Sequence, residues 1–502
     1  MKKRASGILL PVASLPTKYG IGGFSKEAYE FVDQLAKAGQ RYWQILPLGP
    51  TGYGDSPYQA FSTFAGNPYY IALDTLKEEG LLTAEECEAA DCGQYPGYVD
   101  YGRVYETRFT ALRKAFDRFK AAGCPEEFKR FCRENSEWLD DYSLYSVIKN
   151  ANGGRGWDEW PDDLRNREPD ALAAAREEYA EEIDFYRFMQ YKFTEQWNKL
   201  RAYANSKNIG IIGDIPIYVA MDSSDAWSEP ELFQFDEDNR PKAVAGCPPD
   251  AFAVTGQLWG NPLYDWEYHK KTGYAWWVRR MRQCNKLYDV VRVDHFRGFA
   301  GYYAIPYGEE TAVNGHWEKG PGIDLFVTLK KELGKLNCIA EDLGFLTDDV
   351  RTMVKKSGYP GMKILEFAFY SDSSDPYLPH NYDKNCVVYT GTHDNETVVG
   401  WFGNLPKKNR DMVLRYLGKT VPKKKSIPKG ISWDIIRLGM VSVADLCVIP
   451  MQDYLELGNE ARYNFPSTLG TNWKWRILPG QITDDLLDRI YTMTEVSGRL
   501  AD

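Results

Sequence analysis

The sequence has little of what several protein classes require. Across its 502 residues, no apolar run approaches the roughly 20 residues that a membrane-spanning helix needs. Lysine and arginine (61 residues) are outnumbered by aspartate and glutamate (71 residues), which gives a net charge of -10. Nucleic acids and anionic membranes select clustered positive charge. We therefore expect neither of them as a partner.

Cysteine and histidine are sparse as well. The nine cysteines contain no CxxC pair, and the five histidines show no metal-ligand spacing, so a catalytic zinc site is not expected. Scattered cysteines without a pairing pattern are typical of a reducing compartment, and we expect a cytoplasmic protein. The N-terminus resembles a signal peptide, but Pro11 and Pro16 break its apolar part, which we assign to a first strand.

Nucleotide-binding and serine-hydrolase signatures are missing too. No glycine-rich phosphate loop follows a predicted strand, and the segment GYGDSPY lacks a Walker lysine. No GxSxG elbow is present, which removes the commonest α/β-hydrolase architecture. A magnesium site of the enolase type, built from three strand-end carboxylates, stays open at this point.

Aromatic residues, by contrast, are plentiful, with 15 tryptophans and 34 tyrosines. Packing in the core accounts for most of them. A groove for sugars is the alternative for the remainder, because the apolar C–H faces of a sugar stack on aromatic rings.

Short apolar runs recur at eight places, with helix-like sequence between most of them. Such runs are typical of strands buried on both faces of a parallel sheet. Eight strand–helix units that close on themselves form a (β/α)8 TIM barrel, whose chemistry lies at the carboxyl ends of its strands. The predicted strands lie near residues 8, 45, 211, 291, 339, 364, 388 and 448.

The predicted organisation is a single catalytic barrel domain over residues 1–502. Residues 51–205 begin as a loop rich in Gly, Pro, Ser and Tyr and continue with helical periodicity, which predicts a largely helical insertion between strands two and three. Residues 220–285 are expected to form a loop insertion after strand three that contributes to an active-site lid.

Several of the apolar runs end in a carboxylate. One such residue could be a helix cap or part of a solvated loop, but a barrel interior is costly for unpaired charge, so a set of acids that converges at the barrel mouth indicates function. The strand-end acids are Asp214, Asp294, Glu341, Glu366, Asp394 and Asp453.

Three of these acids have informative neighbours. Arg292 and Asp294 lie on the same face of a strand, and the arginine is expected to hold that carboxylate ionised. Glu341 ends the apolar run CIAE, so desolvation is expected to keep it protonated near neutral pH. Asp394 follows His393 in a polar loop. One ionised and one protonated carboxyl group are what glycosidic cleavage requires, and a separation of roughly 5 Å would mean a covalent glycosyl-enzyme.

Eight specific motifs occur in order along essentially the whole chain: SGILLPVASLPTKYGIG, WQILPLGPTGYGDSPYQAFSTFAGNP, GDIPIYV, GQLWGNPLYDW, VRVDHFRGF, AEDLG, GTHDNETVVGW and RYNFPSTLGTNWKWR. With these motifs the sequence resembles the 4-α-glucanotransferases of glycoside hydrolase family 77, the amylomaltases or disproportionating enzymes. The resemblance implies that Asp294 is the nucleophile and Glu341 the general acid/base. It also implies that Asp394 holds sugar hydroxyls and favours ring distortion.

The same resemblance implies a set of substrate-binding residues. Asp214 could equally tie loops together, and packing within its loop is the less favoured alternative for Trp259. Arg292 is expected to support the nucleophile, and Tyr58 to stack on the sugar at the cleavage point. The implied substrate-binding residues are Ser56, Tyr58, Asp214, Gln257, Trp259, Arg292, His295, His393 and Asn464.

The implied reaction transfers a segment of an α-1,4-glucan to the 4-hydroxyl of glucose or another glucan, with retention and without a metal or other cofactor. Maltooligosaccharides, amylose or glycogen-derived glucans and glucose are the expected partners of a monomer or weak homo-oligomer. Two alternatives stay open, of which the first uses the same carboxylates. A hydrolase would differ only in the acceptor, and a non-catalytic glucan-binding protein would usually have lost a carboxylate.

Two features leave finer properties open. Cys247 and Ala251 depart from the family pattern in the stretch that resembles its mobile lid, which puts acceptor preference in doubt. Tyr53 and Tyr101 are aromatic and predicted to lie outside the catalytic cleft, where they could form a second glucan-binding groove.

Overall fold

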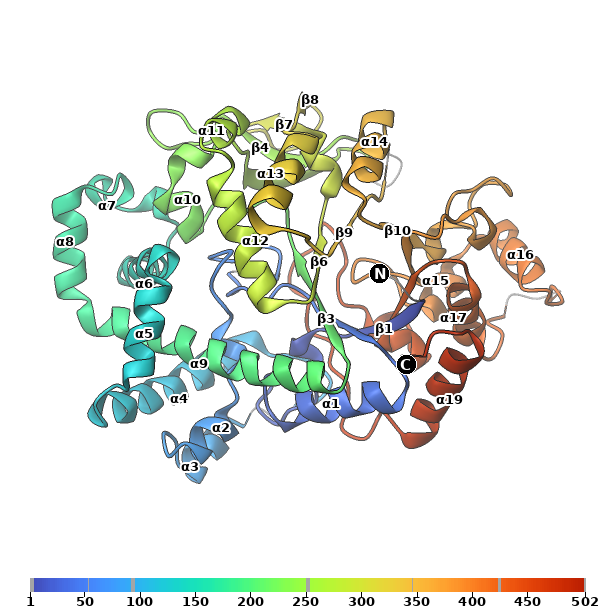
Figure 1. Cartoon of the computed structure of the whole chain (residues 1–502), viewed down its shortest axis with the longest axis horizontal. Helices are drawn as coiled ribbons and strands as arrows, with labels where there is room; N and C mark the ends of the chain where they lie inside the picture. Colours follow the sequence, from blue (N-terminus) through green and yellow to red (C-terminus); the bar gives the residue numbers. More distant parts are fainter. Residues whose placement is uncertain are drawn as a thin grey trace.

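A sheet of eight strands lies at the centre of the computed structural model (Figure 1). The structure describes residues 4–52, 54–91, 95–249, 253–344, 346–422 and 426–500. Each strand lies within, or one residue from, one of the apolar runs that predict it. The strands are β1 (Ala5–Leu9), β2 (Tyr42–Gln44), β3 (Gly210–Ile215), β6 (Val290–Val293), β9 (Cys338–Ala340), β10 (Gly361–Ile364), β11 (Cys386–Tyr389) and β12 (Leu446–Pro450).

The pairings of this sheet are all parallel, in the order β10-β11-β12-β1-β2-β3-β6-β9. The two end strands approach each other, and the Ala340 N–H donates to the Pro360 carbonyl at 2.9 Å, so the sheet is a nearly closed barrel. Strands β11 and β12 are buried along their whole length because both of their faces are apolar. The predicted (β/α)8 TIM barrel is confirmed.

Amphipathic helices cover the outside of the barrel. In α1 (Lys26–Lys37), the buried residues Ala28, Phe31, Val32 and Leu35 follow helical spacing and face the strands. Among the described helices, none is both long enough and apolar enough to cross a membrane. The other helices that follow the barrel strands from β6 onward, or the lid segment before it, are α12 (Ala275–Leu287), α13 (Ile323–Leu333), α14 (Asp348–Ser357), α15 (Val398–Asn404), α16 (Lys407–Tyr416), α17 (Ile431–Val441), α18 (Met451–Tyr454) and α19 (Asp484–Val496).

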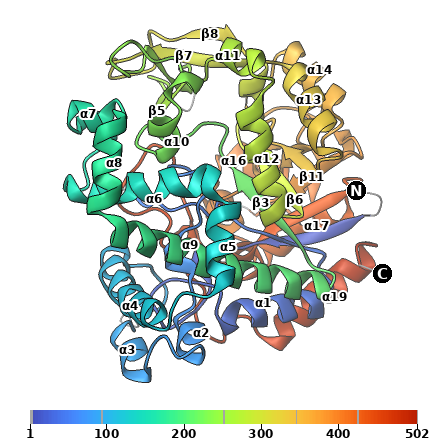
Figure 2. The same ribbon diagram turned by 60° about the vertical axis from the view of Figure 1, so that its left-hand side comes forward.

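The segment between β2 and β3 leaves the barrel and forms a helical body on its left in Figure 1, which comes forward in Figure 2. The long helix α9 returns the chain to β3 and packs beside α1. The helices of this body are α2 (Leu73–Glu78), α3 (Ala84–Ala89), α4 (Tyr101–Ala121), α5 (Glu126–Glu134), α6 (Ser136–Ala151), α7 (Asp162–Arg165), α8 (Pro169–Glu178) and α9 (Ala180–Ser206).

Two buried glutamines of α9 fix the polar loop that follows β2. The Gln190 side chain accepts from the Gly66 N–H at 2.7 Å and donates to the Gly66 carbonyl at 2.8 Å. The Gln196 side chain accepts from the Ala72 N–H at 2.7 Å and donates to its carbonyl at 3.3 Å. The backbone N–H and C=O groups of Gly66 and Ala72 are thus both hydrogen-bonded to α9, and these bonds hold the loop against the helix.

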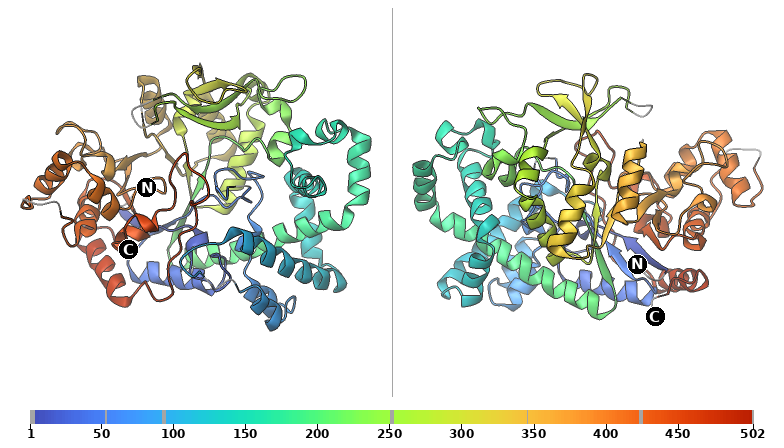
Figure 3. Two further views of the ribbon diagram at one scale, coloured as in Figure 1. Left: turned by 180° about the vertical axis from the view of Figure 1, so that it is seen from behind. Right: turned by 45° about the horizontal axis from the view of Figure 1, so that its top comes forward.

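A second, antiparallel sheet covers the upper side of the barrel in the orientation of Figure 1 and is seen from two further sides in Figure 3. The sequence predicts a loop insertion over 220–285, but two of the strands form there, beside α10 (Ser224–Ser228) and α11 (Trp266–Lys271). These two strands pair with each other, and β4 also pairs with a strand beyond that range, which is too distant in sequence for a local pattern to reveal. In order, the strands are β5 (Gln257–Pro262), β4 (Ala243–Cys247), β7 (Gly301–Pro306) and β8 (His316–Lys319).

The buried side chain of Arg499 fastens the end of the chain to the barrel. Its guanidinium donates to the carbonyls of Ala5, at the start of β1, and of Met440 and Ala444, which precede β12, at 2.8, 2.7 and 2.9 Å. A buried charge is tolerated only when its hydrogen-bonding groups are satisfied, as they are here.

Replacing Arg499 by Met is therefore expected to lower the free energy of unfolding by about 3 kcal/mol, because several buried carbonyls lose their donor. Arg351→Met is the matched control, since that side chain is 63% exposed and pairs with Asp348 at the surface. Thermal or urea unfolding measures both variants. Equal stability of the two would contradict the role assigned to Arg499.

Candidate active site

The carboxyl ends of β3 and β6 carry a buried ion network. Asp214 and Arg292 are register partners on these neighbouring strands. Arg292 Nη1 donates to both carboxylate oxygens of Asp214, at 2.8 and 2.7 Å, and Nη2 donates to Asp294 Oδ1 at 2.9 Å. Burial raises the pKa of the Asp214 carboxyl, against the lowering effect of the arginine charge. Arg292 thus joins two carboxylates and places Asp294, which is 29% exposed, at the barrel mouth.

Glu341 lies next to this network because of the register between β6 and β9. Val293 and Ala340 are partners across these strands, and Asp294 and Glu341 are the residues that follow them. The Glu341 N–H donates to the Val293 carbonyl at 3.1 Å, which extends the ladder to this point. Two carboxyl groups are therefore brought side by side by backbone pairing.

The environment of the Glu341 carboxyl raises its pKa to about 7. Burial is the largest cause, and the negative charge of Asp294 adds to it. Arg292 and two backbone donors act in the opposite direction: the N–H groups of His295 and Leu343 bond the two carboxyl oxygens at 2.7 and 2.8 Å. Near neutral pH this group can therefore both give and take a proton.

Asp394 lies in the loop after β11 and has a different environment. Burial alone would raise its pKa, but the charge of His393 and hydrogen bonds from His393 and Asn464 hold the pKa of this carboxyl well below its usual range. His393 Nε2 lies 3.2 Å from Asp394 Oδ2, and Asn464 Nδ2 donates to Oδ1 at 2.6 Å. Asp394 therefore stays an anion near neutral pH, with both of its oxygens bonded.

Tyr58 connects the ion network to the His393 loop. Its hydroxyl donates to Asp214 Oδ2 at 2.8 Å and lies 3.3 Å from His393 Nδ1. Its ring stacks on the His393 ring with 4.8 Å between centroids. The Tyr58 N–H donates to Ser56 Oγ at 3.3 Å. Both residues belong to the loop that α9 holds.

The antiparallel sheet β5-β4-β7-β8, called the lid sheet from here on, supplies the wall beside Glu341. The Trp259 ring meets the His295 ring edge-on, with 4.8 Å between centroids, and Trp259 Nε1 donates to Gln257 Oε1 at 3.1 Å. His295 has left-handed backbone geometry (φ 50°), which is uncommon for a residue other than glycine. Burial and then the charge of Arg297 lower the pKa of His295 to about 3, so its ring is neutral near pH 7.

The contacts join all the predicted site residues into two groups that meet where Glu341 lies beside Asp294. The first group is Ser56, Tyr58, Asp214, Arg292, Asp294, His393, Asp394 and Asn464. The second group is Gln257, Trp259, His295 and Glu341. The sequence thus predicts a set of side chains that the fold places together.

Two further side chains reach the first group without having been predicted. Arg462 Nη2 donates to the Asp394 carbonyl at 2.8 Å, and its Nε donates to the Asn464 carbonyl at 2.9 Å. The Trp473 ring lies 5.8 Å from the Tyr58 ring and 5.9 Å from the His393 ring, centroid to centroid. Both lie in the motif RYNFPSTLGTNWKWR, which was the signal available in the sequence.

An aromatic pair near Glu341 was also missed. Phe367, which follows β10 and is 37% exposed, packs edge-on against Tyr377 with 5.5 Å between centroids. Burial is the largest cause of the raised pKa of Tyr377, and the charges of Asp342 and Glu341 add to it.

The structure describes two of the four residues that the sequence connects with acceptor preference and with a second glucan-binding groove. Cys247 lies on β4 opposite Gln257, within the lid sheet. Ala251 and Tyr53 lie outside the described residues. Tyr101 begins α4, is half-buried, and donates its hydroxyl to the Trp473 carbonyl at 2.7 Å. A second glucan-binding groove at Tyr53 and Tyr101 stays a prediction.

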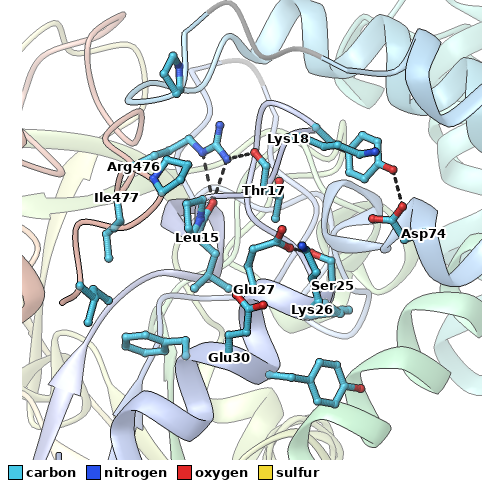
Figure 4. Close-up of a pocket in the computed structure, with 18 of the residues that line it drawn as sticks. Leu15, Thr17, Lys18, Ser25, Lys26, Glu27, Glu30, Asp74, Arg476 and Ile477 are labelled. Carbon is cyan, nitrogen blue, oxygen red and sulfur yellow. Dashed lines mark hydrogen bonds between the residues drawn. The ribbon is translucent and has the colours of Figure 1, made fainter. Parts of the chain in front are cut away.

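A separate cavity of about 1030 Å³ lies between the start of α1, α2 and residues 476–482 (Figure 4). None of the predicted site residues lines it. Within it, Tyr19 donates to Asp74 at 2.7 Å and Arg476 donates to the Leu15 carbonyl at 2.9 Å. Convergent groups with shifted pKa values mark a reactive site better than volume does, so the barrel mouth is the candidate active site. In the described residues no cluster of three or more His, Cys, Asp or Glu could hold a metal ion.

Comparison with known proteins identifies the family. The sequence model of glycoside hydrolase family 77, described as 4-alpha-glucanotransferase, matches residues 10–481. The chain belongs to this family. A 4-alpha-glucanotransferase of Clostridium butyricum is 49% identical over 490 residues, which cover 97% of this chain and 99% of that protein. A 4-alpha-glucanotransferase of Streptococcus pneumoniae is 48% identical over 501 residues, which cover 100% of this chain and 98% of that protein.

Solved structures agree with this assignment. An amylomaltase from Streptococcus agalactiae in complex with acarbose has a TM-score of 0.96 and 40% identity, covering 99% of this chain and 100% of that one. An amylomaltase from Corynebacterium glutamicum, at 18% identity, shares the fold with a TM-score of 0.79 and covers 99% of this chain and 75% of its own. The chain is an enzyme of the 4-alpha-glucanotransferase class, as the resemblance in its sequence implies, and this family acts on α-1,4-glucans.

The pKa of Glu341 predicts the pH dependence of turnover. As pH rises through about 7, the protonated fraction of Glu341 falls, so a step that needs its proton slows on the basic side. Glu341→Gln is expected to lower kcat about 10²- to 10⁴-fold. Rates on maltotriose across pH measure both effects. A wild-type kcat/KM with no basic limb near pH 7 would contradict the assignment.

The same shift has a consequence for stability. The folded state binds the Glu341 proton more tightly than the unfolded state, since its pKa is raised from 4.5 to about 7. Ionisation therefore destabilises the fold progressively as pH rises over this range, and fully above it. Glu341→Gln removes that penalty and is expected to add about 1–3 kcal/mol at about pH 8 but little at about pH 4. Thermal unfolding at both pH values measures this; an equal effect at both would refute it.

Proposed function

We propose that the chain transfers a segment of an α-1,4-glucan to the 4-hydroxyl of glucose or another glucan by retaining double displacement. The observation that carries this proposal is the pairing of β6 with β9, which puts Asp294 and Glu341 side by side at the barrel mouth. Asp294 is bonded to a guanidinium, and Glu341 has a pKa near neutrality. These are the two environments that a nucleophile and an acid/base need.

In the first step Asp294 attacks the anomeric carbon of the donor glucan. A carbon–oxygen bond forms to the carboxylate while the glycosidic bond breaks, and Glu341 gives its proton to the departing 4-oxygen. Arg292 stays bonded to Asp214 throughout and keeps the attacking oxygen at the mouth of the barrel. The product is a covalent glycosyl-enzyme and a shortened glucan.

In the second step Glu341, now ionised, takes the proton from the 4-hydroxyl of an acceptor sugar. The acceptor oxygen attacks the anomeric carbon, the bond to Asp294 breaks, and both carboxyl groups return to their starting states. Two inversions give net retention. One glycosidic bond replaces another, so the reaction consumes no nucleotide or redox cofactor.

The remaining site residues are proposed to hold the sugar. Asp394 and Asn464, which are bonded to each other, would bind ring hydroxyls and strengthen those bonds as the ring distorts. The stacked rings of Tyr58 and His393 would form one face of the sugar pocket. Further contacts are assigned to Ser56, Gln257, Trp259 and His295.

We also infer the setting of the reaction. Maltooligosaccharides, amylose and glycogen-derived glucans are the proposed donors, and glucose or another glucan is the acceptor. None of the eight described cysteines forms a disulfide, which supports a reducing compartment such as the cytoplasm. The proposed assembly is a monomer or a weak homo-oligomer.

Incubation with maltotriose alone tests the proposed transfer. Sugar capture of the intermediate predicts a ladder of longer glucans plus glucose, with the number of reducing ends nearly constant. Glucose and maltose with rising reducing ends would mean that water takes the intermediate and the chain is a hydrolase. No turnover would favour a glucan-binding protein.

Asp294→Asn is expected to lower kcat on the order of 10³-fold or more, because an amide cannot form the covalent intermediate. Asp324→Asn on α13 is the matched control, since that carboxylate is 60% exposed. Chromatography of the products and mass spectrometry of trapped enzyme follow both variants. A glycosyl-enzyme on a residue other than Asp294 would refute the mechanism.

A further inference from the structure

Trp473 has a backbone conformation that its surroundings must enforce. Its φ is 65°, in the left-handed region, where a bulky side chain is a genuine outlier. Strain of this kind persists only where neighbouring structure over-determines it, and it is common at functional sites. The residue lies beside the stacked Tyr58 and His393 rings, not in a remote turn.

Hydrogen bonds hold both peptide groups of Trp473. Its N–H donates to the Tyr463 carbonyl at 2.6 Å, and its carbonyl accepts from the Tyr101 hydroxyl at 2.7 Å. The preceding residue closes the loop: Asn472 accepts from the Phe465 N–H at 3.0 Å. The left-handed conformation is therefore fixed from both sides of the peptide chain.

Tyr101 reaches this point because a short pairing joins two distant segments. Residues 97–99 run antiparallel to residues 474–476, with the Val99 N–H bonded to the Lys474 carbonyl at 2.8 Å and the Arg476 N–H bonded to the Gly97 carbonyl at 2.9 Å. This register carries the first residue of α4 to the Trp473 carbonyl. The helical insertion thereby contacts Trp473, whose ring lies beside the Tyr58 and His393 rings.

The three rings form one cluster. Tyr58 and His393 stack face to face, and the Trp473 ring is tilted against both, at 44° and 39°. Tyr58 bonds Asp214 and His393 bonds Asp394, so a shift of the pair would move groups that bond two of the strand-end carboxylates. A displacement of about 1 Å at such a site can cost about 10²-fold in rate.

We propose that Trp473 is a positioning residue that fixes the stacked Tyr58–His393 pair, and that the Tyr101 hydroxyl latches it in its left-handed conformation. This inference rests on the proposed function, since the pair it positions is the one assigned to the sugar pocket. It also gives Tyr101 a role that differs from direct contact with glucan in a second groove.

Tyr101→Phe tests the latch with minimal change, because it removes one hydroxyl and keeps the ring. The expected result on maltotriose is a fall in kcat of about 3- to 10-fold, the value of one hydrogen bond, with KM unchanged within about twofold. Tyr105→Phe is the matched control, one turn further along α4 and 51% exposed, and it should match the wild type. Wild-type transfer on maltotriose, measured in parallel, checks the proposed function independently.

Long amylose separates the two roles of Tyr101. A latch acts at the catalytic site, so kcat should fall equally on maltotriose and on long amylose. A loss confined to long amylose would mean that Tyr101 contacts glucan outside the site, and it would overturn the proposal. Unchanged kcat on both substrates would overturn it as well.

Trp473→Gly and Trp473→Phe test whether the Trp473 ring positions the Tyr58–His393 pair. Glycine adopts φ 65° without strain, so the backbone is retained while the ring is lost, and kcat should fall about 10²-fold. Phenylalanine restores an aromatic ring and should recover part of this loss. Thermal unfolding checks that both variants fold. Wild-type kcat in a folded Gly variant, or no recovery with Phe, would overturn the positioning role.

Discussion

A single buried guanidinium, that of Arg292, holds the barrel mouth together. Burying a cation costs several kcal/mol unless anions and hydrogen bonds compensate it, and here Asp214 and Asp294 share it. Asp214 in turn accepts a hydrogen bond from the Tyr58 hydroxyl. Because these groups come from neighbouring strands and from the loop after β2, the position of Asp294 depends on the register of the barrel itself.

Environment, more than residue type, separates the acids at this mouth. Glu341 accepts two backbone N–H groups, yet burial and the charge of Asp294 outweigh them and raise its pKa to about 7. The carboxylate of Asp394 is 46% exposed at its side chain, pairs with His393 and accepts from Asn464, and its pKa is held low. Acids whose environments push their pKa values apart can take distinct roles in one reaction.

The additions to the barrel surround this chemistry. The lid sheet brings Trp259 against His295, α9 holds the loop that carries Tyr58, and α4 reaches the Trp473 carbonyl through Tyr101. In the proposed mechanism a sugar must meet the intermediate before water does, which depends on how these walls exclude solvent. The carboxyl groups of the barrel are proposed to cleave the bond, and the insertions would decide which acceptor completes the reaction.

Eight apolar runs, six of which end in a carboxylate, predicted the barrel from sequence alone, because strands buried on both faces have few other solutions. Arg292 and Asp294 could be predicted together because they lie two residues apart in one strand. The lid sheet could not be predicted, since β4 pairs with β7 from a segment beyond β6. The role proposed for Trp473 could not be predicted either, because it depends on rings and a hydroxyl from other segments. Tertiary structure alone decided these features, since strand partners, burial and strain arise only when distant parts of the chain meet.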